Sequence, residues 1–274
     1  MSAEIPASLS SAAASKKWWW PTSRAASGAP AQPGTGKPTL SWLQARSMYS
    51  RAHKLLTSGN LSDGLALMTK AASSNNVAAL LWLGEYYLAH TATTQQGTTY
   101  LLRACKLGSA EANLVLGKYY FSQGYIVEAQ NHLLAAEKLQ FGIAQTDLGF
   151  LFFRKYATHF QTSDGYLAEN YIRYAYEKRR GLPPSAAPLL LLLCCIYALL
   201  GEKDKGDKSY MSLEKMLGQP SNVSNLTRWK NTFSLALTPC FPDDHMSVVF
   251  YIAHKAKGAR ISQVALSLTS SPNK

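Results

Sequence analysis

The side chains that could perform catalysis or hold a metal are few and scattered. The four cysteines form no C-x-x-C pair, and adjacent Cys194 and Cys195 would point to different faces of a helix. The other two, Cys105 and Cys240, also lie in apolar runs. Such cysteines are typical of buried, reduced thiols in an intracellular protein, and they do not form the clustered thiol set that zinc prefers.

The remaining polar motifs do not supply catalytic chemistry either. Six histidines are spread along the chain without an H-E-x-x-H motif, and neither a G-x-S-x-G elbow nor a phosphate-binding glycine loop occurs. Asp243, Asp244 and His245 form the only dense polar triplet, which a turn after Pro242 explains better than a metal site does. We therefore expect a protein that is not an enzyme, with no catalytic residue, cofactor or metal.

Positive charge is concentrated towards the two ends of the sequence. The chain carries a net charge of +12, of which residues 1–62 contribute +6 and residues 245–274 contribute +4. Basic ends of this kind indicate contact with a polyanion, which could be RNA, an anionic membrane surface or an acidic partner; the alternative is a solvated tail. The candidate contacts are Lys16, Lys17, Arg24, Lys37, Arg46, Arg51, Lys255, Lys257 and Arg260.

Three consecutive tryptophans, Trp18, Trp19 and Trp20, follow Lys16 and Lys17 directly. Indole rings beside positive charge could dock in a groove of a partner, lie at a membrane interface or stack on bases. They could instead fold back and cap an exposed end of the protein. We expect either partner docking or self-capping, and membrane insertion is less favoured because no amphipathic helix surrounds the cluster.

The elements that would position such residues are indicated by a short sequence motif that recurs along the chain, which we call the repeated phrase. Leu83-Gly84-Glu85-Tyr86-Tyr87 recurs as Leu116-Gly117-Lys118-Tyr119-Tyr120 and, more loosely, as Leu148-Gly149-Phe150-Leu151-Phe152. The Leu-Gly pairs thus recur at an almost constant interval, and this period is typical of stacked helix pairs. Such stacks usually bind other molecules on their long open surfaces.

Each unit has a second apolar-periodic run that ends at a glycine, Gly108 in one unit and Gly142 in the next. These end glycines fit helix C-cap positions, where positive φ is required. The glycine of each Leu-Gly pair lies inside a helix, where it costs about 1 kcal/mol relative to alanine. We therefore expect Gly84, Gly117 and Gly149, together with Tyr87 and Tyr120, to pack helices closely within the repeats.

The layout small-x-x-Leu-Gly-x-x-Tyr, a linker and then Ala-x-x-x-Leu-x-x-Ala before a glycine resembles the Sel-one-like branch of the tetratricopeptide superfamily. The clear match covers residues 79–181. Two departures are a linker over 89–97 that lacks the usual glycine-turn-acid arrangement and an insertion over 156–164. The resemblance implies a non-enzymatic adaptor, with degenerate units on either side of the clear ones.

We predict an all-α fold: a right-handed superhelical solenoid of antiparallel helix pairs, with a largely irregular N-terminal extension and a short C-terminal tail. The regions are a basic extension over 1–40, helical repeats over 41–217, C-terminal helices over 218–257 and a basic tail over 258–274. The run 186–200 has only 15 residues, so we expect a buried helix and no membrane span. Further helices are expected over 43–56, 62–72, 166–180, 205–217, 225–237 and 247–257.

Residues 1–40 are rich in Ser and Ala and contain one acid, Glu4, which is a composition typical of mitochondrial import segments; a disordered tail of a cytoplasmic or nuclear protein fits as well. The favoured function is a scaffold or adaptor subunit that binds a partner protein through the helical repeats and is anchored by its basic tails. The alternative is an RNA-associated structural subunit of a ribonucleoprotein, such as the mitochondrial ribosome.

Overall fold

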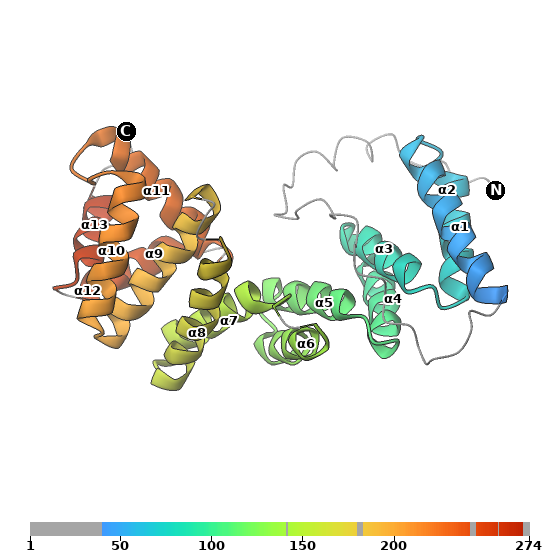
Figure 1. Ribbon diagram of the computed structural model, residues 1–274, viewed down its shortest axis with the longest axis horizontal. Coiled ribbons are helices and arrows are strands. Elements are labelled where there is room, and N and C mark those ends of the chain that lie inside the picture. Colours follow the sequence, from blue (N-terminus) through green and yellow to red (C-terminus); the bar gives the residue numbers. More distant parts are fainter. Residues whose placement is uncertain (1–39, 141, 180–182, 242–244, 257, 271–274) are drawn as a thin grey trace. The chain divides into compact units, whose positions relative to one another are not determined.

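The computed structural model describes residues 40–140, 142–179, 183–241, 245–256 and 258–270 (Figure 1). Its described residues form helices and no strand, so the prediction of an all-α fold is confirmed. The elements are α1 (Leu40–Thr57), α2 (Leu61–Ser73), α3 (Val77–Leu88), η3 (Thr91–Thr93), α4 (Thr94–Lys106), α5 (Ala110–Ser122), α6 (Ile126–Leu139), α7 (Gln145–His159), α8 (Thr162–Arg179), α9 (Pro183–Leu200), α10 (Lys203–Leu217), α11 (Val223–Leu237), α12 (His245–Lys255) and α13 (Arg260–Ser270).

The predicted N-terminal extension lies outside the described residues up to position 39. This includes Lys16, Lys17, Trp18, Trp19, Trp20, Arg24 and Lys37, so the expectations for these residues remain predictions.

Local cap chemistry starts and stops several of the helices. The side-chain oxygens of Asn60, Asn76 and Ser109 each accept a hydrogen bond from a backbone N–H in the first turn of α2, α3 and α5, respectively. The connection from α4 to α5 joins both kinds of signal, because Gly108 takes a φ of +82° immediately before the Ser109 cap. Gly142, the other predicted end glycine, also has positive φ.

Neighbouring helices pack in consecutive pairs. The most extensive contacts join α1 with α2, α3 with α4, α5 with α6 and α7 with α8, and smaller contacts link one pair to the next (Figure 1). Within three of these pairs, a glycine of the first helix meets an aliphatic side chain of the second: Gly84 meets Leu101, Gly117 meets Leu133 and Gly149 meets Ile172. A Cβ atom at Gly117 would lie 2.7 Å from two Leu133 side-chain carbons, so the helices approach closely there.

The pair α1 and α2 follows the same register without a Leu-Gly phrase. A Cβ atom on Gly64 of α2 would meet Leu56 of α1, as one on Gly97 of α4 would meet Leu88 of α3. The interval from Gly64 to Gly97 equals the interval between the first two Leu-Gly phrases, and that from Leu56 to Leu88 equals the interval between the second and the third. The repeat spacing therefore extends upstream of the three phrases that the sequence makes obvious.

Two segments that we expected to depart from the repeat pattern, over 156–164 and 89–97, are more helical in the structure than predicted. The predicted insertion over 156–164 is mostly helical, because α7 continues to His159 and α8 begins at Thr162, with Phe160 in the left-handed conformation at φ 57°. The predicted linker over 89–97 contains η3 and the first turn of α4. Gly97 therefore lies inside a helix and not in a connection.

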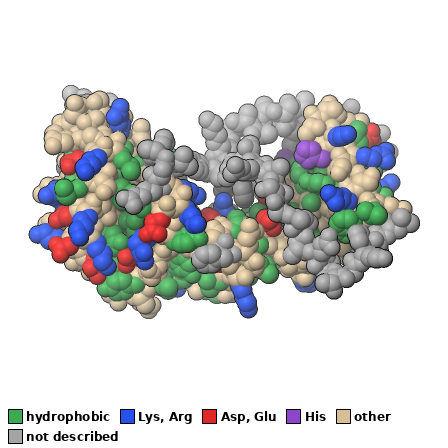
Figure 2. All heavy atoms as spheres, viewed as in Figure 1, with side chains coloured by type: hydrophobic (Ala, Val, Ile, Leu, Met, Phe, Trp, Pro, Cys, Tyr) green, Lys and Arg blue, Asp and Glu red, His purple; other side chains and the backbone are tan. Residues whose placement is uncertain are grey.

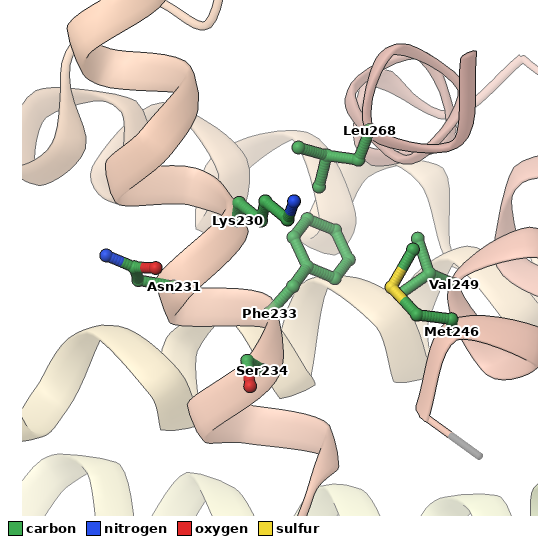
Figure 3. Close-up of a pocket in the computed structure, with 7 residues that line it drawn as sticks. All are labelled: Lys230, Asn231, Phe233, Ser234, Met246, Val249 and Leu268. Carbon is green, nitrogen blue, oxygen red and sulfur yellow. The ribbon is translucent and has the colours of Figure 1, made fainter. Parts of the chain in front are cut away.

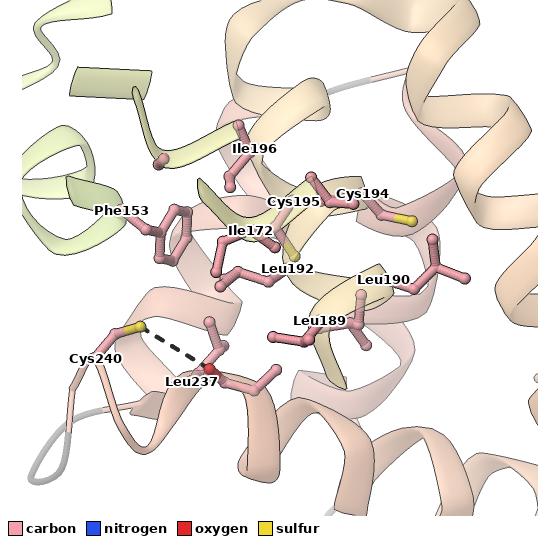
Figure 4. Close-up of a cluster of buried hydrophobic side chains, with 14 of the residues drawn as sticks. Phe153, Ile172, Leu189, Leu190, Leu192, Cys194, Cys195, Ile196, Leu237 and Cys240 are labelled. Atoms are coloured by element: carbon pink, nitrogen blue, oxygen red, sulfur yellow. Dashed lines mark hydrogen bonds between the residues drawn. The ribbon is translucent and has the colours of Figure 1, made fainter. Parts of the chain in front are cut away.

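The apolar run 186–200 forms most of α9, and the prediction of a buried helix is confirmed. Its Leu189, Leu192 and Ile196 pack with Phe153 of α7 and Ile172 of α8 in one hydrophobic cluster (Figure 4). Pro188 lies within the helix. The six other helices whose limits we predicted, α1, α2, α8, α10, α11 and α12, start and end within a few residues of those limits.

The prediction of a basic C-terminal tail over 258–274 is wrong for most of its length. Residues 260–270 form α13, which packs on α12 and buries Ile261, Val264, Ala265 and Leu268. These four positions repeat with helical spacing and give the segment one apolar face. Burial of that face stabilises the helix despite the positive charge around it.

Candidate partner-binding surface

The two tyrosines of the repeated phrase have different environments. The second one stacks on a ring of the following helix: Tyr87 on Tyr100 with centroids 5.8 Å apart, and Tyr120 on His132 at 5.5 Å. The looser third unit does the same with Phe152 on Tyr171 at 5.7 Å. All three pairs are within 16° of parallel, so this ring pair is part of the packing inside each helix pair.

The first tyrosine of each phrase lies outside the hydrophobic core. Tyr86 of α3 and Tyr119 of α5 are half-buried and belong to neither cluster of buried side chains in the described part of the chain, whereas Tyr87 and Tyr120 pack against these clusters. Tyr86 stacks on Trp82 with centroids 5.2 Å apart, and His90 lies one turn further along the same face. The His90 Nδ1 atom is 3.0 Å from the Tyr86 carbonyl oxygen, which holds this aromatic row in place.

Charged side chains continue this surface from helix to helix. Glu85 and Lys118 occupy the same position of the phrase on α3 and α5, and Lys118 Nζ lies 4.0 Å from Asp147 Oδ1 on α7. Burial raises the pKa of Glu85, and Lys118 offsets that shift only in part. The pKa of Asp147 is also raised by burial, against the opposing effect of Lys118 and Arg179. Two desolvated carboxylates thus flank one lysine.

Sequence reasoning did not identify the residues of this surface, which we call the α3–α5 face and define as Trp82, Glu85, Tyr86, Lys118 and Tyr119. The sequence signal that could have identified them was their position within the repeated phrase. The residue after each Leu-Gly pair and the first tyrosine fall on one side of the helix. Aromatic and charged side chains that are partly desolvated on a common face are the usual components of protein interfaces.

The predicted polyanion contacts that the structure describes are not gathered in one place. Arg46 and Arg51 are exposed on α1, where the Arg46 guanidinium lies 5.5 Å from the centre of the Trp42 ring. Lys255 is exposed at the end of α12. Arg260, in contrast, begins α13 and has its Nε atom 3.8 Å from Asp207 Oδ1 of α10, so part of its charge is neutralised within the protein. Lys257 lies outside the described residues.

The other lysine-rich element, α10, does not add a surface of one sign. Its exposed Lys203, Lys205 and Lys208 alternate with Asp204 and Asp207, and Figure 2 shows blue and red side chains interspersed over this helix. Lys205 forms ion pairs with Glu169 and Glu202, at 4.0 Å and 3.6 Å. This helix is therefore mixed in charge.

The thiols lie apart from the surfaces described above. Cys194, Cys195 and Cys240 are buried, and Cys240 Sγ donates a weak hydrogen bond to the Ala236 carbonyl oxygen (Figure 4). Burial raises the pKa of all three thiols, and that of half-buried Cys105 to about 11. Among the described residues, no three His, Cys, Asp or Glu side chains are grouped so that they could hold a metal ion.

No protein-family model matches this sequence, and no curated protein matches it significantly. In the part of the chain that the structure describes, every helix is too short or too polar to cross a membrane.

Proposed function

We propose that this protein is a non-enzymatic scaffold or adaptor subunit of a larger assembly, which binds a partner protein through its helical repeats and is anchored by its basic ends. The observation that supports this proposal best is that the two aromatic positions of the repeated phrase have different environments. The second ring of each phrase stacks inside its helix pair, whereas Tyr86 and Tyr119 lie outside the hydrophobic core and next to Glu85 and Lys118 in the sequence, and burial raises the pKa of Glu85.

The proposal includes the finer architecture. Pairs of helices in a common register, with close glycine contacts that recur at the interval of the Leu-Gly phrases, are consistent with antiparallel pairs stacked in a right-handed solenoid of the Sel-one-like type. In such a stack the α3–α5 face spans two consecutive units, so it can contact an extended segment of a partner at more than one point.

The physical case for a protein partner rests on surface chemistry. Trp82 and Tyr86 are rigid, half-buried rings, with Trp82 packed against the core on one side, and burying their remaining surface costs little side-chain entropy. Glu85 and Asp147 are already partly desolvated, so a partner cation that approaches them gains attraction at a reduced cost in lost hydration. We therefore expect the bound segment to present basic and apolar side chains to this face.

Recovery of bound proteins with a tagged full-length chain tests the proposal. The test variant is Tyr86→Ser with Tyr119→Ser, and the control is Tyr125→Ser with Val127→Ser, which changes two exposed side chains at the start of α6. We expect the same partner with wild type and control, and loss of that partner with the test variant while its circular dichroism spectrum remains that of the folded wild type. Equal recovery with the test variant would exclude the α3–α5 face as the binding surface.

An RNA-associated role in a ribonucleoprotein is the second candidate, and one observation favours it. Helix α1 carries Arg46, Arg51 and Lys54 without any acidic side chain in its sequence. If these residues contact phosphates, their replacement by Gln should weaken binding to a nonspecific single-stranded RNA and flatten its salt dependence, because fewer counterions are released. No binding by wild type at low salt would remove this candidate.

Localisation in mitochondria is part of the proposal and rests on the composition of residues 1–40. Fusion of these residues to a fluorescent protein tests it, with Lys16, Lys17 and Arg24 replaced by Glu as the control. Mitochondrial fluorescence that the control loses would support import, and diffuse fluorescence of the unmodified fusion would refute it.

A further inference from the structure

The three C-terminal helices, like α1, carry basic side chains and no acidic ones. The sequences of α11, α12 and α13 contain no Asp or Glu. Their basic residues are Arg228 and Lys230 on α11, Lys255 on α12 and Arg260 on α13. Arg260 is paired with Asp207 of α10, whereas Arg228, Lys230 and Lys255 are exposed. The formal charges within these three helices are therefore all positive.

A pocket opens between these three helices. It has a volume of about 160 Å³ and is lined by Lys230, Asn231, Phe233 and Ser234 of α11, Met246 and Val249 of α12, and Leu268 of α13. Figure 3 shows the ring of Phe233 facing Met246 and Val249, with the Lys230 side chain beside it. The lining thus combines the apolar side chains of Phe233, Met246, Val249 and Leu268 with an ammonium group, an amide and a hydroxyl from α11.

The pocket continues into an apolar stripe along α12. Met246, Phe250 and His254 follow each other at intervals of four residues and so lie on one face of the helix. Met246 is 42 % exposed and Phe250 is 55 % exposed, and the ring centroids of Phe250 and His254 are 4.1 Å apart. Because Met246 belongs to both features, the pocket and the stripe form one continuous surface.

We propose that this surface binds an acidic amphipathic segment of a partner protein, with one aliphatic side chain in the pocket and a neighbouring carboxylate paired with Lys230 Nζ. An apolar cavity of about 150 Å³ accommodates benzene, so the pocket has room for one branched aliphatic side chain. Apolar anchors in pockets, surrounded by complementary charge, are the usual centres of protein interfaces. The surface is separate from the α3–α5 face, so this inference does not depend on the proposed function.

Charge and shape together favour a protein segment over other polyanions. A membrane surface would attract the lysines and contact the exposed stripe, but it would leave the pocket between the helices without an occupant. A nucleic acid base could stack on Phe250, which is 55 % exposed, but it would leave the pocket without an occupant, because Phe233 there is only 2 % exposed. An amphipathic protein segment can place an aliphatic side chain in the pocket, cover the stripe with its apolar face and pair its carboxylates with the basic side chains.

The test uses the full chain and a fluorescein-labelled peptide of about 18 residues, long enough to form a helix, with Leu on one face and Glu on the other. Two further peptides serve as probes, one with Lys in place of Glu and one with Ser in place of Leu. The protein variants are Lys230→Glu and Met246→Gln. Their matched controls are Lys215→Glu and Met211→Gln on α10, because Lys215 is also exposed and Met211 is 49 % exposed.

We expect fluorescence anisotropy to show binding of the Leu/Glu peptide and of neither altered peptide. Lys230→Glu and Met246→Gln should each weaken binding about tenfold or more, and the two controls should not. In spectra of methyl-labelled methionine, the Met246 signal should shift on binding while that of fully buried Met68 stays in place.

Three results would overturn the proposal. The first is no binding of the Leu/Glu peptide, and the second is equal binding of the Ser-containing peptide, which would indicate charge attraction alone. The third is binding of the protein to vesicles of equimolar phosphatidylcholine and phosphatidylserine, lost in Lys230→Glu, while the peptide does not bind. That result would assign the surface to anionic lipid.

Discussion

Gly97 of α4 lies against the backbone of Gly84 in α3: a Cβ atom added to Gly97 would stand 2.9 Å from the Gly84 carbonyl oxygen. The same atom would be 2.8 Å from the backbone nitrogen of Leu88. Backbone atoms can move only if the helix moves, so two helices are held together here at a distance that only glycine permits.

Replacement of Gly97 should therefore destabilise the protein although alanine is the better helix former. For Gly97→Ala we expect the free energy of unfolding to fall by about 1–2 kcal/mol, because overpacking outweighs the gain in helix propensity. Gly206→Ala on α10 is the matched control, since its Cβ would meet only Tyr197 Cβ at 3.5 Å, and it should stabilise by about 0.5–1 kcal/mol. Urea unfolding measures both, and shifts of the same sign would contradict the packing argument.

His132 should make stability depend on pH. Its Nδ1 lies 3.0 Å from Asn113 Oδ1 and its ring stacks on Tyr120. Burial lowers the pKa of His132 below its ordinary value of 6.5, so the unfolded chain binds more protons just below that pH and stability is lost as the pH falls through about 6.5.

His132→Phe keeps a stacked ring but cannot titrate. The free energy of unfolding of the wild type, measured relative to this variant, should decrease between about pH 7.5 and 5.5. A wild type and a His132→Phe variant with parallel pH profiles would show that the imidazole is not desolvated.

Glu85 should lower the stability of the folded protein at neutral pH while contributing to partner binding. Burial raises its pKa from an ordinary value of 4.5, so the folded state binds more protons just above that pH and stability falls as the pH rises through this window. Glu85→Gln should therefore raise the melting temperature at neutral pH, and its advantage over wild type should shrink towards pH 4.5. Exposed Glu128→Gln is the control. If Glu85→Gln also loses the partner, the carboxylate is retained for function.

Thiol labelling should distinguish Cys105 from the other cysteines. Cys105 is half-buried with a pKa of about 11, so it should react slowly in the folded protein. Cys194, Cys195 and Cys240 are fully enclosed and should react only after unfolding. Cys105→Ser should abolish the reaction of the folded protein with a chromogenic disulfide reagent. Labelling of Cys194 or Cys240 at the rate of Cys105 would show that the α9 core opens readily.

The helices could be predicted from the sequence because their signals are local. Asn60, Asn76 and Ser109 cap the turns that immediately follow them, and Gly108 and Gly142 stop chain segments through their own φ angles. The helical spacing of apolar residues needs only neighbouring positions to be recognised. The same signal was present in α13, where counting charge over residues 245–274 concealed the apolar face of Ile261, Val264 and Leu268.

Side-chain environments within the repeat depended on the partner helix. Leu-Gly-x-Tyr-Tyr shows two adjacent tyrosines that the sequence cannot distinguish, but only the second lies opposite a ring of the next helix. Gly97 reads as part of a linker until α3 is placed against it.

The chain by itself therefore determined where helices form and how they repeat, since capping, turn geometry and periodicity act over a few residues. The tertiary structure alone decided which faces stay open. The pocket joins Lys230, Met246 and Leu268 from three helices, and the α3–α5 face depends on how two helix pairs meet. Both surfaces result from packing between residues distant in sequence, whose contacts depend on the shapes of all the side chains between them.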